Sequence, residues 1–328
     1  MKLFNTRNFT VFCILLLFTT SFVKSNSENS KQNEDTKVTM SKDKYYESDE
    51  RFQRPSKIPA VELKYNFHLN YPNVPPYIAS GYPELYESSE DVVHGYFSTI
   101  KNAANMTGYY GGCGTILWND SAFPYAYRLF TNEREELVSL ESFKESFKGT
   151  GATNLIQLLP AYKPKNTPNN IDYYFIETEV LKGYPISDNE KVMPNYFEYY
   201  YGIVTTRYDK EYGWQIESID YLPEIYLCHP QHGWDYYYDS FIEIIYNSWY
   251  KMNLNITNEV IEDNIITVYA NNNTDEYKFI FVRLANGDDV LLHEYKKQDD
   301  DWKEVSLLEG DNENHYKMSI LKFRGKND

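Results

Sequence analysis

One cysteine and two histidines lie close together in the segment Cys228-His229-Pro230-Gln231-His232. Thiolate and imidazole groups are preferred zinc ligands, but a zinc site needs four ligands, or three and a water, usually with a second ligand cluster elsewhere in the chain. His293 and His315 are isolated in the sequence, so they do not form that second cluster. We therefore expect no metal, and we interpret this segment as a turn ahead of a helix.

The sequence contains no Gly-x-Ser-x-Gly, no His-Glu-x-x-His and no phosphate-binding loop. The run Gly111-Gly112-Cys113-Gly114 is rich in glycine, but it lacks the Lys-Ser/Thr pair of a nucleotide loop. A cysteine nucleophile at Cys113 would need a histidine partner, which the sequence does not place. We assign no catalytic residue, expect no cofactor and favour a protein that is not an enzyme.

Residue spacing divides the region 60–223 into helices followed by strands. Strict alternation of apolar and polar residues from Val61 to Asn70 predicts a half-buried strand. Helical spacing of apolar residues predicts a helix that begins at Ser89, a short helix over Phe123 to Phe130 and a third over Ser139 to Phe147. Four strands are then predicted, at Asn154 to Tyr162, Ile171 to Leu181, Tyr196 to Tyr208 and Gly213 to Leu222.

A smaller unit is predicted over 224–328. An amphipathic helix from Asp235 to Met252 is followed by strands near Val260 and over Ile265 to Ala270, Tyr277 to Leu284, Val290 to Lys296 and Trp302 to Leu308. Asn286-Gly287 predicts a two-residue hairpin, because both positions favour positive φ. The sequence as a whole predicts an α+β protein with two folded units.

The order of elements before Pro223, with long strands that close on Gly213-Trp214-Gln215-Ile216-Glu217-Ser218-Ile219, resembles the superfamily of nuclear transport factor two, ketosteroid isomerase and scytalone dehydratase. The resemblance covers about Ser88 to Pro223. It implies helices packed on a curved antiparallel sheet that together form a cone. Many exported bacterial proteins of unknown role carry such a domain, and the fold hosts enzymes and non-enzymes alike.

The resemblance suggests residues that could line a pocket in the cone. The closing strand of such folds faces the cavity, so Trp214 is a candidate for the pocket wall, with plain core packing as the alternative. His94 and Tyr96, on the first predicted helix, are further candidates. For His94 we favour a histidine of the core or its boundary over a catalytic base.

In the enzymes of this superfamily, carboxylates, tyrosines or histidines inside the cone carry the reaction. A general base here would be a buried carboxylate with a raised pKa. Asp172, Asp220 and Glu198 lie on predicted strands, but the register of such aromatic runs does not decide which of them faces inward.

The first 25 residues have the form of a secretory signal peptide. Lys2 and Arg7 precede an apolar run from Phe9 to Val23, and Val23-Lys24-Ser25 resembles a cleavage site. An uncleaved N-terminal anchor is the alternative, although the run is short for a membrane span. The polar residues 26–59 predict a disordered linker, because they bury too little apolar surface to offset the entropy of ordering.

The composition narrows the partners of the exported part. The formal net charge is -16, which disfavours nucleic acid and flat binding to anionic membranes. Tyrosine occurs 33 times, and its flat apolar ring with a polar tip suits contacts with glycans or peptides; AT-rich codons are the alternative explanation for its frequency.

Two cysteines, Cys113 and Cys228, remain after the leader. Outside the cytoplasm they can oxidise to a disulfide, which would stabilise by about 4–5 kcal/mol in the chain-entropy model. We favour two unpaired thiols, because nothing in the sequence forces the two residues together.

These observations lead to one expected function and two alternatives. We expect a secreted or extracytoplasmic, non-catalytic binding or scaffolding protein whose partner is an envelope glycan, peptide or protein. The alternatives are an isomerase, dehydratase or hydrolase that uses a pocket in the cone, and a structural component of a coat or matrix.

Overall fold

A computed structural model of the chain describes residues 56, 58–69, 74–110, 119–164, 167–186, 196–224 and 236–308. The leader at 1–25, nearly all of the linker at 26–59, Cys113 and the Cys228 to His232 segment lie outside the described residues. The expectations about cleavage, the linker, the disulfide and a metal at Cys228 therefore stay predictions.

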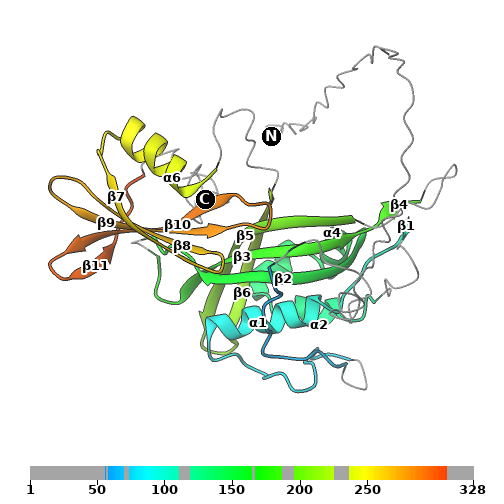
Figure 1. The fold of residues 1–328 in the computed structure, drawn as a ribbon. Coiled ribbons are helices and arrows are strands. Elements are labelled where there is room, and N and C mark those ends of the chain that lie inside the picture. The colour runs from blue at the N-terminus through cyan, green and yellow to red at the C-terminus, as the bar shows by residue number, and fades with distance from the viewer. Residues whose placement is uncertain are drawn as a thin grey trace, which may run out of the picture. The chain divides into compact units, whose positions relative to one another are not determined.

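Four long strands form an antiparallel sheet, here called the first sheet, in the order β2-β3-β5-β6 (Figure 1). They are β2 (Thr150–Pro160), β3 (Ile171–Lys182), β5 (Tyr196–Asp209) and β6 (Gly213–Pro223). Each corresponds to one of the four predicted strands, whose aromatic and β-branched residues suit a half-buried pleated surface. The predicted class, α+β with antiparallel strands, is confirmed.

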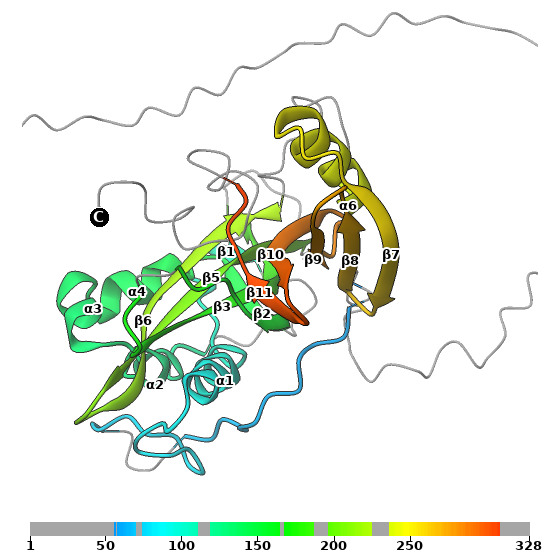
Figure 2. The ribbon, with the colours of Figure 1, turned by 90° about the vertical axis from the view of Figure 1, so that its left-hand side faces the viewer.

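Four short helices precede these strands and pack on one face of the first sheet (Figure 2). They are α1 (Ser89–Ile100), α2 (Phe123–Tyr127), α3 (Asn132–Leu137) and α4 (Leu140–Ser146). The first helix begins at Ser89 as predicted, and Ser88 caps it, because its Oγ accepts a 3.1 Å hydrogen bond from the backbone N of Asp91. The sequence does not predict α3, since none of its residues is buried and no apolar stripe marks it.

The strand predicted from Val61 to Asn70 is wrong. Residues 61–69 run as extended chain outside any strand, with a 2.9 Å backbone hydrogen bond from Val61 N to Leu155 O. The predicted alternation is nevertheless present: Val61, Leu63, Tyr65 and Phe67 are half-buried against the core, and the residues between them are exposed. The alternation therefore reports a half-buried extended segment, not a hydrogen-bonded ladder.

A second antiparallel sheet, the second sheet, has the order β11-β10-β9-β8-β7. It consists of β7 (Asn255–Glu262), β8 (Ile265–Asn271), β9 (Glu276–Arg283), β10 (Asp289–Gln298) and β11 (Asp301–Glu304). Before it, α6 (Tyr238–Phe241) runs on into a π-helix, η4 (Ile242–Trp249), in place of the single α-helix predicted over Asp235 to Met252. A two-stranded sheet pairs β1 (Tyr109–Tyr110) with β4 (Tyr184–Pro185).

The turn between β9 and β10 is longer than the two-residue hairpin that Asn286-Gly287 predicts. The strand β9 ends at Arg283 and β10 begins at Asp289. Within the turn, the backbone N of Gly287 donates a 2.9 Å hydrogen bond to Leu284 O. Gly287 has the positive φ that the sequence predicts, at 98°. The Asn286 side chain, which accepts a 2.9 Å bond from Asp288 N, extends the turn by organising its second half.

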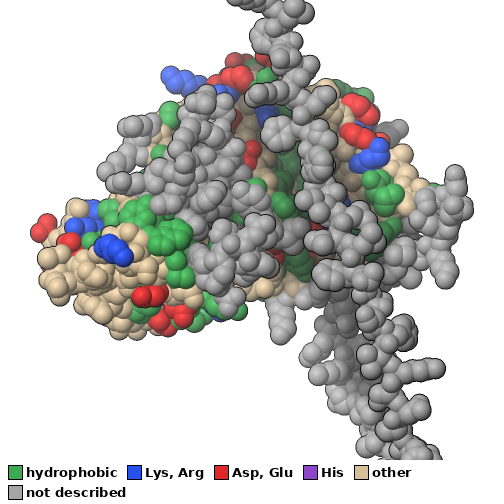
Figure 3. All heavy atoms as spheres, turned by 90° about the horizontal axis from the view of Figure 1, so that it is seen from above, with side chains coloured by type: hydrophobic (Ala, Val, Ile, Leu, Met, Phe, Trp, Pro, Cys, Tyr) green, Lys and Arg blue, Asp and Glu red, His purple; other side chains and the backbone are tan. Residues whose placement is uncertain are grey.

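Three clusters of buried apolar residues form the core. One lies between the helices and the first sheet, and one lies between η4 and the second sheet. The middle cluster draws on both sheets, with Phe175, Tyr201 and Ile203 from the first and Val282 and Leu292 from the second. The boundary predicted at 223/224 stays a prediction. On the face seen in Figure 3, acidic and basic side chains of the described residues are interspersed.

Candidate functional site

A cavity of about 390 Å³ lies between the helical layer and the first sheet. Its floor is formed by Thr178, Val180 and Lys182 of β3, which share one face of the strand because side chains alternate with period two. Residues from α1, α2, α3, α4, β2, β5 and β6 and from the loops between the helices complete the lining, so segments far apart in the sequence form it together. This cavity is the candidate functional site.

A bulge in β6 brings two further residues to the cavity. Thr205 pairs with Ser218 and Thr206 pairs with Ile216, which leaves Glu217 as an extra residue in the ladder. The extra residue shifts the alternation by one, so that Ile219 and Tyr221 lie on the same helix-covered face as Ile216 and line the cavity. Sequence periodicity does not predict this, because the bulge breaks the period.

Aromatic rings from the helical layer form the opposite wall. Phe143 of α4 lies edge-on to Phe130, with ring centroids 5.6 Å apart, and contacts Phe147 at 5.3 Å. Tyr96 of α1 packs on Phe130 in the same way, at 5.6 Å. These edge-to-face contacts fix the rings in place. The wall is therefore largely apolar and already formed.

Two basic side chains line the cavity, and none of its described lining residues is acidic. Lys182 Nζ donates a 3.3 Å hydrogen bond to Thr150 Oγ1, and no carboxylate of the described residues lies within ion-pair distance of Arg134 or Lys182. The Arg134 charge acts on the Tyr96 hydroxyl, where it opposes the larger effect of burial; the net result is a pKa of Tyr96 raised well above its usual value.

Of the three candidate carboxylates, Glu198 of β5 pairs with Val180 in the ladder and so lies on the cavity face of the sheet. The Tyr200 hydroxyl donates a hydrogen bond to it. Burial, and then Glu198, raise the pKa of Tyr200. The other two candidate carboxylates are engaged elsewhere: Asp172 accepts from Ser89 Oγ at 2.7 Å, and Asp220 accepts from Ser218 Oγ at 2.9 Å.

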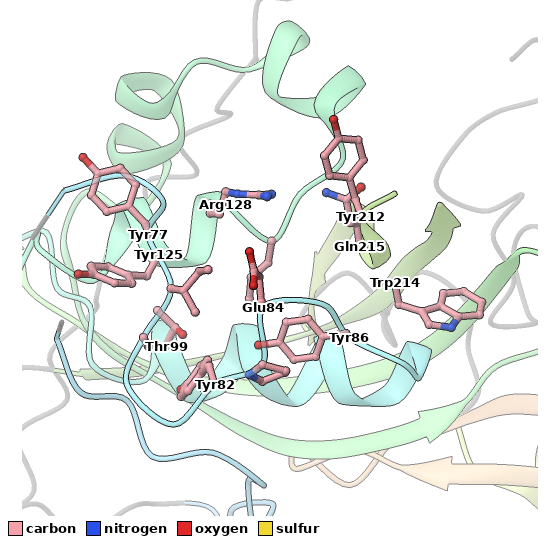
Figure 4. A pocket seen from close by; sticks show the side chains of 14 residues that line it. Tyr77, Tyr82, Glu84, Tyr86, Thr99, Tyr125, Arg128, Tyr212, Trp214 and Gln215 are labelled. Atoms are coloured by element: carbon pink, nitrogen blue, oxygen red, sulfur yellow. The ribbon is translucent and has the colours of Figure 1, made fainter. Parts of the chain in front are cut away.

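The residues suggested as pocket residues do not come together. Tyr96 lines the cavity, whereas Trp214 lines a separate small pocket of about 30 Å³, room for about one water molecule (Figure 4). His94 lines neither. It is buried, its Nε2 lies 3.5 Å from Glu90 Oε1, and burial lowers its pKa against the opposing effect of Glu90.

Two buried carboxyl groups on the other face of the first sheet were not found by sequence reasoning. Glu177 Oε1 accepts a 2.7 Å hydrogen bond from Ala285 N, and Glu224 Oε2 accepts a 3.1 Å bond from Asn286 N. Burial, and then the neighbouring Glu177, raise the pKa of Glu224 to about 9. The available signal was periodicity, because Glu177 shares its face of the strand with Tyr173 and Phe175.

Within the described ranges, no group of three or more His, Cys, Asp or Glu side chains could hold a metal ion. The helices of those same ranges include none that is long and apolar enough to cross a membrane. Comparison of the chain with protein-family models, curated proteins and solved structures gives no match. The geometry of the cavity therefore carries the functional argument.

Proposed function

We propose that this chain is an exported, non-catalytic binding protein of the cell envelope or medium that holds a small ligand or part of a larger one in the cavity. The cavity carries the proposal: its volume of about 390 Å³ falls in the range of small-molecule sites, and it combines aromatic walls with a few polar groups. The form of the N-terminal leader supports export. An envelope glycan or peptide with an apolar group is a suitable partner.

We also propose that 60–223 has the cone-like fold of the nuclear transport factor two superfamily. The order of helices and strands supports this, as do the three register shifts in the first sheet, since bulges bend strands. The position of the cavity between helices and sheet supports it further.

Binding of phenylnaphthylamine, a neutral dye whose fluorescence rises in apolar sites, tests the function. The wild-type protein binds it saturably with one site per chain. Val180→Trp fills the floor of the cavity and abolishes binding, whereas Val260→Trp, the same change on exposed β7, leaves it intact. Ser142→Trp, on the exposed surface of α4 at the cavity rim, weakens binding without touching the core. Wild-type protein that binds no dye, or a folded Val180→Trp variant that binds it unchanged, contradicts the proposal.

A second candidate function, an isomerase or dehydratase, rests on Glu198. Its carboxyl lies on the cavity face of the sheet with a tyrosine hydroxyl bonded to it, as a general base with an acid partner would be. Hydrogen–deuterium exchange at the α-carbon of cyclic ketones in D₂O distinguishes the two. If the protein only binds its ligand, the wild type gives no more exchange than the Glu198→Gln variant. Exchange that Glu198→Gln abolishes would establish the enzyme instead.

A further inference from the structure

We infer that the ligand of the cavity is an amphipathic anion: an apolar ring or chain that carries one anionic group, such as a carboxylate or a sulfonate. This inference rests on the proposed function and names the chemistry of its ligand. The apolar part packs on the aromatic wall, and the anionic group lies at the basic side chains.

The wall sets the apolar requirement. Phe130, Phe143 and Phe147 on the helical side face Val180 and Ile219 on the sheet side across the cavity. Phe130 and Phe143 are almost completely buried, so the apolar surface that they offer is screened from bulk solvent. A ligand gains free energy here by moving its own apolar surface out of water and against these rings. A fully polar ligand would not.

The basic side chains set the sign of the charge. Arg134 and Lys182 come from different elements, α3 and β3, yet both line the cavity. The chain has 48 acidic and 32 basic residues, and several of its described cations, such as Lys64 with Asp91, stand in ion pairs, whereas Arg134 and Lys182 do not. Two positive charges without an acidic partner among the described residues attract an anionic group and repel a cationic one.

Hydroxyl groups supply further donors for the anionic group. Thr150 and Thr153 of β2 and Thr178 of β3 line the cavity and are buried. Thr150 Oγ1 already holds Lys182 Nζ, which keeps the ammonium at the cavity. The Thr150 and Thr153 hydroxyls can donate to an anionic group, whereas the Thr178 hydroxyl already donates a 3.4 Å hydrogen bond to Tyr200 O.

Glu198, on the cavity face of the first sheet, would favour a cation. Its carboxylate accepts the Tyr200 hydroxyl, which satisfies part of its hydrogen-bonding capacity, and it does not line the cavity. Selection of a cation would therefore mean that Glu198 outweighs Arg134 and Lys182. The experiment below separates these outcomes.

The test compares two dyes with the same ring system, anilinonaphthalene sulfonate and the neutral phenylnaphthylamine. The wild-type protein binds the sulfonate roughly ten-fold more tightly, equivalent to about 1.4 kcal/mol, and added salt reduces this preference. Arg134→Gln and Lys182→Gln each remove most of the preference while binding of the neutral dye persists. Arg134→Lys retains part of it. The control Lys303→Gln, an equal change of net charge on exposed β11, has no effect.

The possible failures are distinguishable. Equal affinity for both dyes, or tighter binding of the neutral one, overturns the anion inference and leaves the proposed function standing. A preference that Arg134→Gln and Lys182→Gln do not alter also overturns it, since the charge that selects the sulfonate would lie elsewhere. Absence of binding for both dyes contradicts the proposed function itself.

Discussion

Glu177 and Thr178 are neighbours on β3, and their side chains lie on opposite faces of the first sheet. Thr178 lines the cavity below the helices, and Glu177 bonds to the backbone of Ala285 in the β9–β10 turn of the second sheet. On one side of the sheet lies the basic, hydroxyl-rich cavity. On the other side Glu177 and Glu224 bond to the β9–β10 turn, and this buried acidic contact is here called the junction. Glu224, whose pKa is raised to about 9, belongs to the junction. This group bears on stability, whereas the proposed ligand binding concerns the cavity.

The junction makes stability depend on pH. The pKa of Glu224 is about 9 in the folded protein against 4.5 as its ordinary value, so between these values the folded state binds a proton that the unfolded state has lost. The free energy of unfolding therefore falls as pH rises through this window, by at most about 1.4 kcal/mol per pH unit from this group. Below the ordinary value the contribution is fully present.

Glu224→Gln isolates this effect, because the amide imitates the protonated carboxyl. Urea unfolding is measured at pH 5 and at pH 8. We expect the variant to lose less stability than the wild type between the two, by about 1–3 kcal/mol. Glu262→Gln, on exposed β7, is the control and keeps the wild-type slope. A Glu224→Gln variant that keeps this slope would show that Glu224 is ionised in the folded protein.

The buried carboxylate of Asp289 holds the start of α6 to the second sheet. It accepts bonds from Arg283 Nε at 2.8 Å and Nη2 at 3.0 Å, and from Tyr238 N at 3.1 Å. Asp289→Asn leaves the guanidinium unpaired, and we expect the free energy of unfolding to fall by about 2–3 kcal/mol. Asp301→Asn, in an exposed pair with Lys303, changes it by about 0.5 kcal/mol or less. Similar losses in both variants would contradict the role of burial.

Gly202 on β5 is required by the close approach of β6. A Cβ at this position would lie 1.9 Å from the backbone O of Asp220. Gly202→Ala forces the strands apart, and we expect a loss of about 3 kcal/mol or more, together with weaker dye binding because its ladder partner Tyr221 lines the cavity. Gly287→Ala, with positive φ but open space, costs only about 1–2 kcal/mol. Thermal unfolding and dye titration of both variants check this order.

Tyr246 of η4 donates a hydrogen bond to the fully buried carboxyl of Glu294 on β10. Removal of the hydroxyl in Tyr246→Phe leaves that carboxyl short of a donor, and we expect a loss of about 1–3 kcal/mol. Tyr208→Phe, at an exposed position on β5, serves as the control and changes stability little. Chemical denaturation measures both, and equal stability of the two variants would show that the buried bond contributes nothing.

Local patterns of this sequence predict its elements well. The long aromatic runs place β3 and β5, and Ser139 marks the start of α4 by its capping hydrogen bond to Ser142 N. They fail where the backbone departs from a regular period or where long-range contacts decide. The extended chain over 61–69 has the alternating pattern of a strand without being one. The helix α3 has no buried residue, so no apolar stripe marks it in the sequence.

The cavity depends on features that the residue pattern of a single strand or helix does not predict. The bulge at Glu217 decides that Tyr221 lines it, and the meeting of α3 with β3 brings Arg134 and Lys182 to one space. Sequence reasoning placed Tyr96 on a helix near a pocket, but it assigned Trp214 to the same pocket, which the structure separates. Long-range packing thus determines the site.

A crystal structure of the protein with anilinonaphthalene sulfonate tests the central claim most directly. The account predicts one dye molecule between α4 and β3, with its rings against Phe143 and Val180 and its sulfonate at Arg134 or Lys182. A dye bound elsewhere, for example at the small pocket beside Trp214 or on the exposed face of β7, with the cavity free of it, would contradict the account.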